Sequence, residues 1–125
     1  MSAPTFKHLK MKDVNGVAVI DFVGSGLESG LMFEATLIQE IGEELHSLLI
    51  DHGRSRILLD FTHVRYLSSS MLGQLARLAR DVENARGQLR ITGLGPVLTD
   101  TFRISHLEPL FEIYDDRASA LKAFR

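Results

Sequence analysis

Cysteine is absent from this chain of 125 residues. Disulfide bonds, thiol catalysis and thiolate metal sites are therefore excluded, and the composition fits a reducing compartment. Basic and acidic residues, 14 and 16 in number, are interspersed, so neither a nucleic-acid-binding block nor an acidic disordered arm is present. No apolar run approaches the ~20 residues that a membrane helix needs, and residues 1–7 lack the apolar core of a signal peptide. We expect a cytoplasmic protein that binds neither nucleic acid nor membrane directly.

The motifs of common enzymes are also missing. There is no Gly-x-Ser-x-Gly elbow and no Walker loop, so neither a serine hydrolase nor an ATPase or kinase is indicated. The Gly-rich stretch 24–30 has three residues before its last glycine where the dinucleotide fingerprint has two, which favours a plain loop. Binding of a nucleotide or small ligand there is the alternative from another functional class. The five histidines include no i, i+4 pair, and we expect no metal, no cofactor and no catalytic residue.

Hydrophobic residues make up 45% and charged residues 24% of the chain, which is typical of one soluble domain, here spanning residues 1–125. Asn15-Gly16 predicts a two-residue hairpin turn, after which helical and strand-like periodicities alternate. The expected elements are strands at 5–11 and 17–23, a helix at 33–52, a strand at 54–61, a helix after the serines to about 85, a strand at 88–94, a short helix from Pro96, a strand at 110–114 and a helix from Asp116. This order predicts an α/β fold, a mixed sheet of about five strands with about four helices and an N-terminal antiparallel hairpin.

Three consecutive serines, Ser68, Ser69 and Ser70, lie between the strand that ends at Phe61 and the following helix. Serine is a preferred N-cap because its hydroxyl accepts a backbone N–H of the first helical turn, so a purely structural role is one interpretation. The other is a phosphorylation switch, since the N-terminus of a helix accommodates a phosphate whose charge alters the surface. Open α/β sheets also place binding sites past the carboxyl ends of their strands. Asp60 is expected to cap the turn or to orient the serines through hydrogen bonds.

Several stretches carry a family resemblance: the hairpin, the long first helix and residues 57–61, 87–94 and 107–115. In these stretches and in the order of its elements the chain resembles, over nearly its whole length, a STAS domain, the fold of bacterial anti-sigma factor antagonists. The family motif after the third strand is an apolar pair, Asp-Ser-Ser-Gly, an apolar residue and Gly. Residues 66–73 read Tyr-Leu-Ser-Ser-Ser-Met-Leu-Gly, so Ser68 replaces the Asp and Met71 replaces the first Gly.

The resemblance implies a regulatory binding protein that is not an enzyme. The unphosphorylated form would bind an anti-sigma factor with serine kinase activity and free the sigma factor, and phosphorylation by that kinase would end the binding. Ser70 matches the usual phosphate acceptor of the family, and Ser69 is the reserve. The partner-binding surface is expected at Ser68, Ser69, Ser70 and Met71, with Met71 adding an adaptable apolar contact if it is exposed.

A second hypothesis within the family is a STAS scaffold that is not switched by phosphate. Such a protein assembles with copies of itself or with other sensors into a large complex. For the antagonist, in contrast, we expect a monomer or a weak homodimer.

Overall fold

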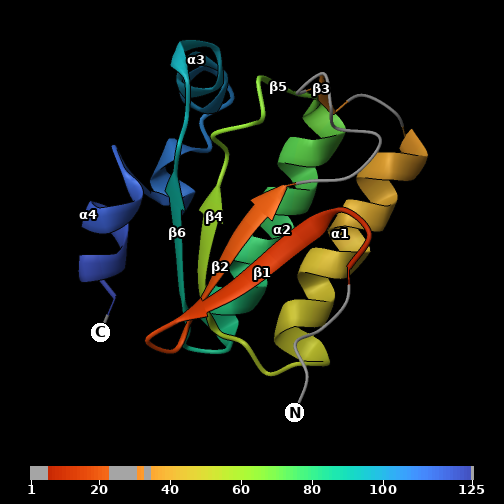
Figure 1. Cartoon of the computed structure of the whole chain (residues 1–125). Helices are drawn as coiled ribbons and strands as arrows, with labels where there is room; N and C mark the ends of the chain where they lie inside the picture. The colour runs from red at the N-terminus through yellow and green to blue at the C-terminus, as the bar shows by residue number, and fades with distance from the viewer. Residues whose placement is uncertain (1–5, 23–30, 33–34, 125) are drawn as a thin grey trace.

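The computed structural model describes residues 6–22, 31–32 and 35–124, and Figure 1 shows their arrangement. The strands are β1 (Leu9–Val14), β2 (Val17–Phe22), β3 (Leu31–Met32), β4 (Arg56–Asp60), β5 (Tyr66–Leu67), β6 (Gln88–Thr92) and β7 (Glu112–Tyr114). The helices are α1 (Ala35–Ile50), α2 (Ser69–Asn84), α3 (Pro96–Ile104), a 3₁₀ turn (Glu108–Leu110) and α4 (Arg117–Lys122). The predicted α/β class is confirmed. The Gly-rich stretch 24–30, predicted as a loop, lies outside the described residues.

The main sheet has five strands in the order β1-β2-β4-β6-β7. β1 and β2 are antiparallel, and the other neighbours are parallel, as expected where helices connect successive strands. The hairpin turn has the positive φ angles that Asn-Gly supports, 52° at Asn15 and 84° at Gly16. Because this two-residue turn sets Val14 opposite Val17, the first strand lies at Leu9–Val14 and the prediction of 5–11 is too early.

Both faces of the sheet are covered, α1 and α2 lying over one face and α4 over the other (Figure 1). Alternate residues of β2 and β4 therefore point into two different apolar clusters. The larger cluster lies under α1 and α2 and includes Leu59 and Phe61, neither of which has exposed surface. The smaller cluster lies under α4, where Val19 and Leu58 pack with Ala120. The sheet, packed on both faces, therefore holds in place the loops and helix ends that follow its strands.

Two short features differ from the prediction. β3 and β5 form a separate parallel pair, which is too short to leave a periodic pattern in the sequence. The last strand is predicted to begin at Leu110, but Leu110 closes the 3₁₀ turn and β7 begins at Glu112. The preceding Pro109 has no backbone N–H with which to join a sheet ladder.

Candidate functional site

Residues 61–70, which we call the serine turn, join the end of β4 to the start of α2 (Figure 1). The Phe61 N–H donates to the Thr92 carbonyl at 2.9 Å, and the Val64 N–H donates to the Phe61 carbonyl at 2.9 Å. Within the turn, β5 pairs with β3. These bonds hold the three serines beyond the carboxyl end of a central parallel strand, where open α/β sheets form binding sites.

Ser68 is the N-cap of α2. Its backbone is extended, with φ −77° and ψ 164°, and its Oγ accepts the Met71 N–H at 3.2 Å. The Ser68 carbonyl also accepts the Leu72 N–H at 3.0 Å, the first bond of the helix. The Ser68 hydroxyl therefore has the structural role that a capping serine fulfils.

Ser69 and Ser70 are the first two residues of α2, and both side chains are exposed. The first turn of this helix contains no acidic residue. Two accessible hydroxyls thus stand at the positive end of the helix dipole, where backbone N–H groups can stabilise an anion. This arrangement is able to accept a phosphate without burying its charge.

Met71 is the member of the predicted partner-binding surface that the structure contradicts. Its side chain has 0% exposed surface and belongs to the main core. The reason is helical geometry: Met71 lies on the same face of α2 as Leu75 and Leu78, and that face packs against the sheet. Replacement of the motif glycine by methionine therefore adds bulk to the core and not to the surface.

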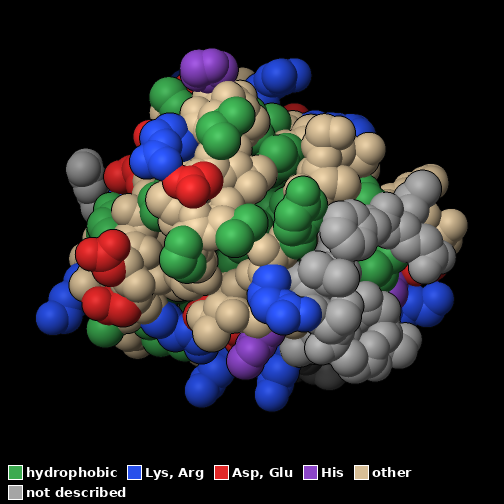
Figure 2. All heavy atoms as spheres, turned by 90° about the horizontal axis from the view of Figure 1, so that it is seen from above, with side chains coloured by type: hydrophobic (Ala, Val, Ile, Leu, Met, Phe, Trp, Pro, Cys, Tyr) green, Lys and Arg blue, Asp and Glu red, His purple; other side chains and the backbone are tan. Residues whose placement is uncertain are grey.

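Exposed apolar area within and beside the serine turn comes from other side chains. Tyr66 in β5 is 47% exposed and Val97 in α3 is 54% exposed, and α3 packs against β5. Figure 2 shows the end of the molecule that carries these elements, with hydrophobic side chains at its surface among charged ones. Neither residue was predicted as a surface contact, because a sequence pattern does not distinguish an exposed apolar residue from a core one.

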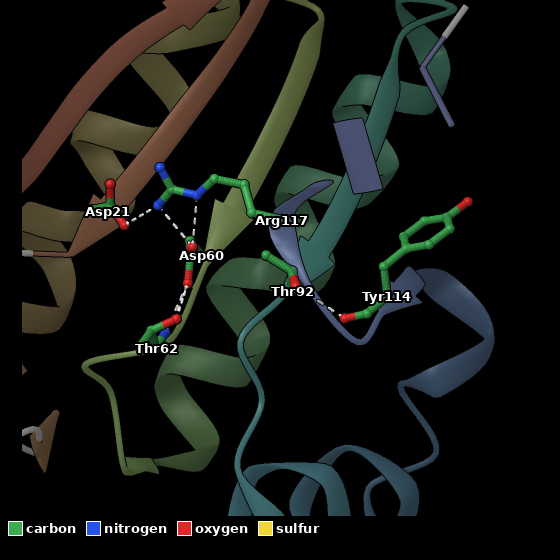
Figure 3. A network of polar contacts seen from close by, with 6 residues as sticks. All are labelled: Asp21, Asp60, Thr62, Thr92, Tyr114 and Arg117. Atoms are coloured by element: carbon green, nitrogen blue, oxygen red, sulfur yellow. Dashed lines mark hydrogen bonds and ion pairs between the residues drawn. The ribbon is translucent and has the colours of Figure 1, made fainter. Parts of the chain in front are cut away.

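Asp60 connects the serine turn to the last helix (Figure 3). Its Oδ1 accepts the Thr62 N–H at 2.9 Å and also the Thr62 hydroxyl, which confirms that Asp60 caps the turn. Its Oδ2 accepts hydrogen bonds from Arg117 Nε at 3.0 Å and Nη2 at 2.7 Å. The same Nη2 donates to Asp21 Oδ1 at 2.7 Å. One guanidinium thus joins β2, β4 and α4.

Electrostatics keep the Asp60 carboxylate ionised. Burial of Asp60 by itself raises its pKa, but the hydrogen bonds from Thr62 and Arg117 and the charge of Arg117 outweigh burial and hold the pKa below its ordinary value. The pKa of Arg117 is raised in turn, chiefly by its hydrogen bond to Asp60. The network is an ion pair that stabilises the end of β4, where the serine turn begins.

Sequence reasoning missed Arg117 and Asp21 because they lie 57 and 39 positions from Asp60. A signal was present: Asp21 and Asp60 both stand in apolar strands, and a carboxylate in such a place needs a cation or hydrogen-bond donors. Gly93 was missed too. A Cβ at this residue would lie 2.5 Å from Asp60 Oδ1 and 2.7 Å from the Thr62 nitrogen, so only glycine leaves room for the capped turn.

Across residues 6–22, 31–32 and 35–124, no group of three or more His, Asp or Glu side chains is arranged to hold a metal ion. In the same part of the chain, no helix has the length and apolar character needed to cross a membrane.

Comparison with known proteins gives a family. The model of the STAS domain matches residues 29–120. BtrV of Bordetella bronchiseptica, which bears the name of an anti-sigma factor antagonist, is 29% identical over 76 residues. That match covers 61% of this chain and 66% of the length of BtrV.

Solved structures have the same fold. An anti-sigma factor antagonist from Mycobacterium paratuberculosis superposes with a TM-score of 0.78 at 21% identity, covering 100% of this chain and 99% of that one. SpoIIAA from Bacillus in its phosphorylated form has a TM-score of 0.68 at 17% identity, covering 94% and 99%. The predicted STAS-like fold with its N-terminal hairpin is confirmed. The chain belongs to the STAS domain family, and its domain is similar to those of anti-sigma factor antagonists.

Proposed function

We propose that this protein is an anti-sigma factor antagonist whose binding to an anti-sigma factor is controlled by phosphorylation of Ser70. The observation that carries the proposal is the exposed Ser70 hydroxyl at the N-terminus of α2 in a STAS domain, at the position that matches the acceptor of the family motif. A phosphorylated form of one structural neighbour, SpoIIAA, supports it. Ser69, also exposed, is the second candidate.

The physical basis is a change of surface charge with little change of fold. A phosphoserine carries about −1.5 to −2 charges at neutral pH. At Ser70 that charge lies in the first turn of α2, where the helix dipole stabilises an anion and no acidic residue opposes it. Ser68 is less suited to the switch, because its hydroxyl already caps the helix. A partner that covers the serine turn would then contact the negative charge of the phosphate.

We further propose that the partner is an anti-sigma factor with serine kinase activity, and that the chain itself is a binding module and not an enzyme. In the unphosphorylated state it would hold the anti-sigma factor and so release the sigma factor. A partner in transcription control implies a cytoplasmic place of action.

Phosphorylation is tested with the purified chain, the anti-sigma factor of the same organism and ATP. We expect phosphate on Ser70, mapped by mass spectrometry, and its loss in Ser70→Ala. Phosphate on neither Ser69 nor Ser70 would contradict the switch.

Binding is tested in parallel by a pull-down with the same anti-sigma factor. Wild type and Ser70→Ala should be retained, whereas Ser70→Asp should be released. Retention of Ser70→Asp with unchanged affinity would show that charge at this residue does not control the partner.

A second candidate is the scaffold that is not switched by phosphate. The departures from the family motif favour the scaffold, because two positions near the acceptor serine carry other residues: Ser68 replaces Asp and Met71 replaces Gly. Size-exclusion chromatography with light scattering separates the two functions. A monomer or weak dimer is expected for the antagonist, and a large homo-oligomer for the scaffold.

A further inference from the structure

A groove of about 660 Å³ lies between α1 and α2, and Ser70 is among the residues that line it. The two helices lie side by side in Figure 1. Apolar side chains contribute to the floor: Ile38 and Leu78 are 4% and 3% exposed. Gly42, another lining residue, is buried as well. The surface between the helices is therefore a depression with an apolar base and not a flat contact.

The Gln74 side chain packs closely over Gly42, which has no Cβ to obstruct it. A Cβ built on Gly42 would lie 2.4 Å from Gln74 Oε1, so the Gln74 amide occupies the space above the glycine. Gln74 is partly exposed, and its amide is the end of a flexible side chain.

The exposed charged side chains that line the groove differ in sign between its two sides, and His46 of α1, which also lines it, lies 3.3 Å from Asp81 of α2. On the α1 side, Glu43 and Asp51 are exposed carboxylates. On the α2 side, the Arg77 side chain is 66% exposed, and its Nε lies 4.0 Å from Asp81 in a weak i, i+4 pair. Such a groove favours an occupant with a basic edge, an apolar middle and an acidic edge, in that order across its width.

The length of the groove fits a short helix. Lining residues extend from Ile38 to Ile50 along α1, which is about 18 Å at the rise of an α-helix. About three helical turns of a partner cover that distance. An amphipathic helix in a groove is a common recognition mode, in which apolar residues at i, i+3, i+4 and i+7 contact the floor.

We propose that this groove receives an amphipathic helix of the anti-sigma factor, with a basic edge toward Glu43 and Asp51 and an acidic edge toward Arg77. The inference rests on the proposed function and deepens it. Ser70, Gln74 and Arg77 lie on one stripe of α2, because residues three and four apart share a helix face. A phosphate on Ser70 therefore adds negative charge on the side that faces the acidic edge of the partner, and repels it.

The test measures affinity for the purified anti-sigma factor by calorimetry, with the unphosphorylated full chain and charge-reversed variants. Arg77→Glu and Glu43→Lys should each weaken binding at least tenfold. The matched controls, Arg80→Glu and Glu83→Lys, reverse exposed charges of α2 that do not line the groove, and should stay within twofold of wild type. Thermal unfolding of each variant confirms that the fold is retained.

A double variant distinguishes an effect of where the charges lie from an effect of the net charge. Glu43→Lys with Arg77→Glu has the net charge of the wild type but exchanges the two sides of the groove, and should bind more weakly than either single variant. Two outcomes would contradict docking in the groove and leave the proposed function intact. One is wild-type affinity in the double variant, and the other is an equal loss of affinity in Arg77→Glu and Arg80→Glu. Absence of any binding by the wild type would overturn both.

Discussion

Arg117, in the last helix, donates two hydrogen bonds to the Oδ2 atom of Asp60, from Nε at 3.0 Å and from Nη2 at 2.7 Å. Asp60 is 6% exposed and stands at the end of the strand that leads into the serine turn. The C-terminal helix therefore supports the candidate switch through one ion pair, although the two residues lie 57 positions apart.

Removal of the cation should destabilise the fold. Arg117→Ala leaves a buried carboxylate without its partner, which costs several kcal/mol when both groups are buried. Because the Arg117 side chain is 38% exposed, we expect a smaller loss, about 2 kcal/mol in the free energy of unfolding measured with urea. Arg103→Ala, which removes an exposed pair with Asp100 in α3, is the control and should cost less than about 0.5 kcal/mol. Equal losses in the two variants would contradict a supporting role of Arg117.

The same ion pair predicts a dependence on pH. The pKa of Asp60 is lower in the folded chain than its ordinary value of 3.8, so at acidic pH the unfolded chain binds the proton first. The stabilisation is present above pH 3.8 and is lost as the pH falls through the folded pKa. In urea unfolding from pH 7 to pH 2, the wild type should lose this stability below about pH 4, and Asp60→Asn should lose less over that range. Parallel pH profiles for the two proteins would show that Asp60 is not the group responsible.

Substitution of the three serines should affect stability differently, because Ser68 has a structural role whereas Ser69 and Ser70 lie at the surface. Ser68→Ala removes the N-cap of α2 and should cost about 1 kcal/mol. Ser69→Ala and Ser70→Ala change exposed side chains and should stay within about 0.5 kcal/mol of wild type. Ser68→Asp, which restores the residue of the family motif, should keep the stability because Asp caps helices as well as Ser. Chemical denaturation measures all four, and a neutral Ser68→Ala would contradict the capping role.

Met71 should behave as a core residue. Met71→Ala removes a side chain with no exposed surface and should cost about 2–5 kcal/mol in thermal or urea unfolding. Met71→Gly, the residue of the family motif, should cost still more because glycine also disfavours the helix. If Met71→Ala were nearly neutral, the side chain would have to lie at the surface.

The sequence by itself determined much of the fold. Asn15-Gly16 predicted the hairpin turn, because few dipeptides adopt two positive φ angles, although the first strand was predicted too early in the chain. Alternating periodicities gave the helices and the parallel strands, since each element must bury one apolar face. The three serines as a group and Asp116 were recognisable as suited to cap helices, because capping is a local interaction that needs only neighbours in the chain.

Only the tertiary structure decided which residues meet across the molecule. Met71 has the same helical spacing whether its face packs on the sheet or contacts solvent, and the packing of α2 put it in the core. Asp21, Asp60 and Arg117 come together because the adjacent strands β2 and β4 end where α4 begins, which joins residues up to 96 positions apart. The groove beside Ser70 likewise depends on two helices that are separated by β4 and β5 in the sequence. Local pattern governs the backbone of each element, whereas the sites arise where elements distant in sequence pack together.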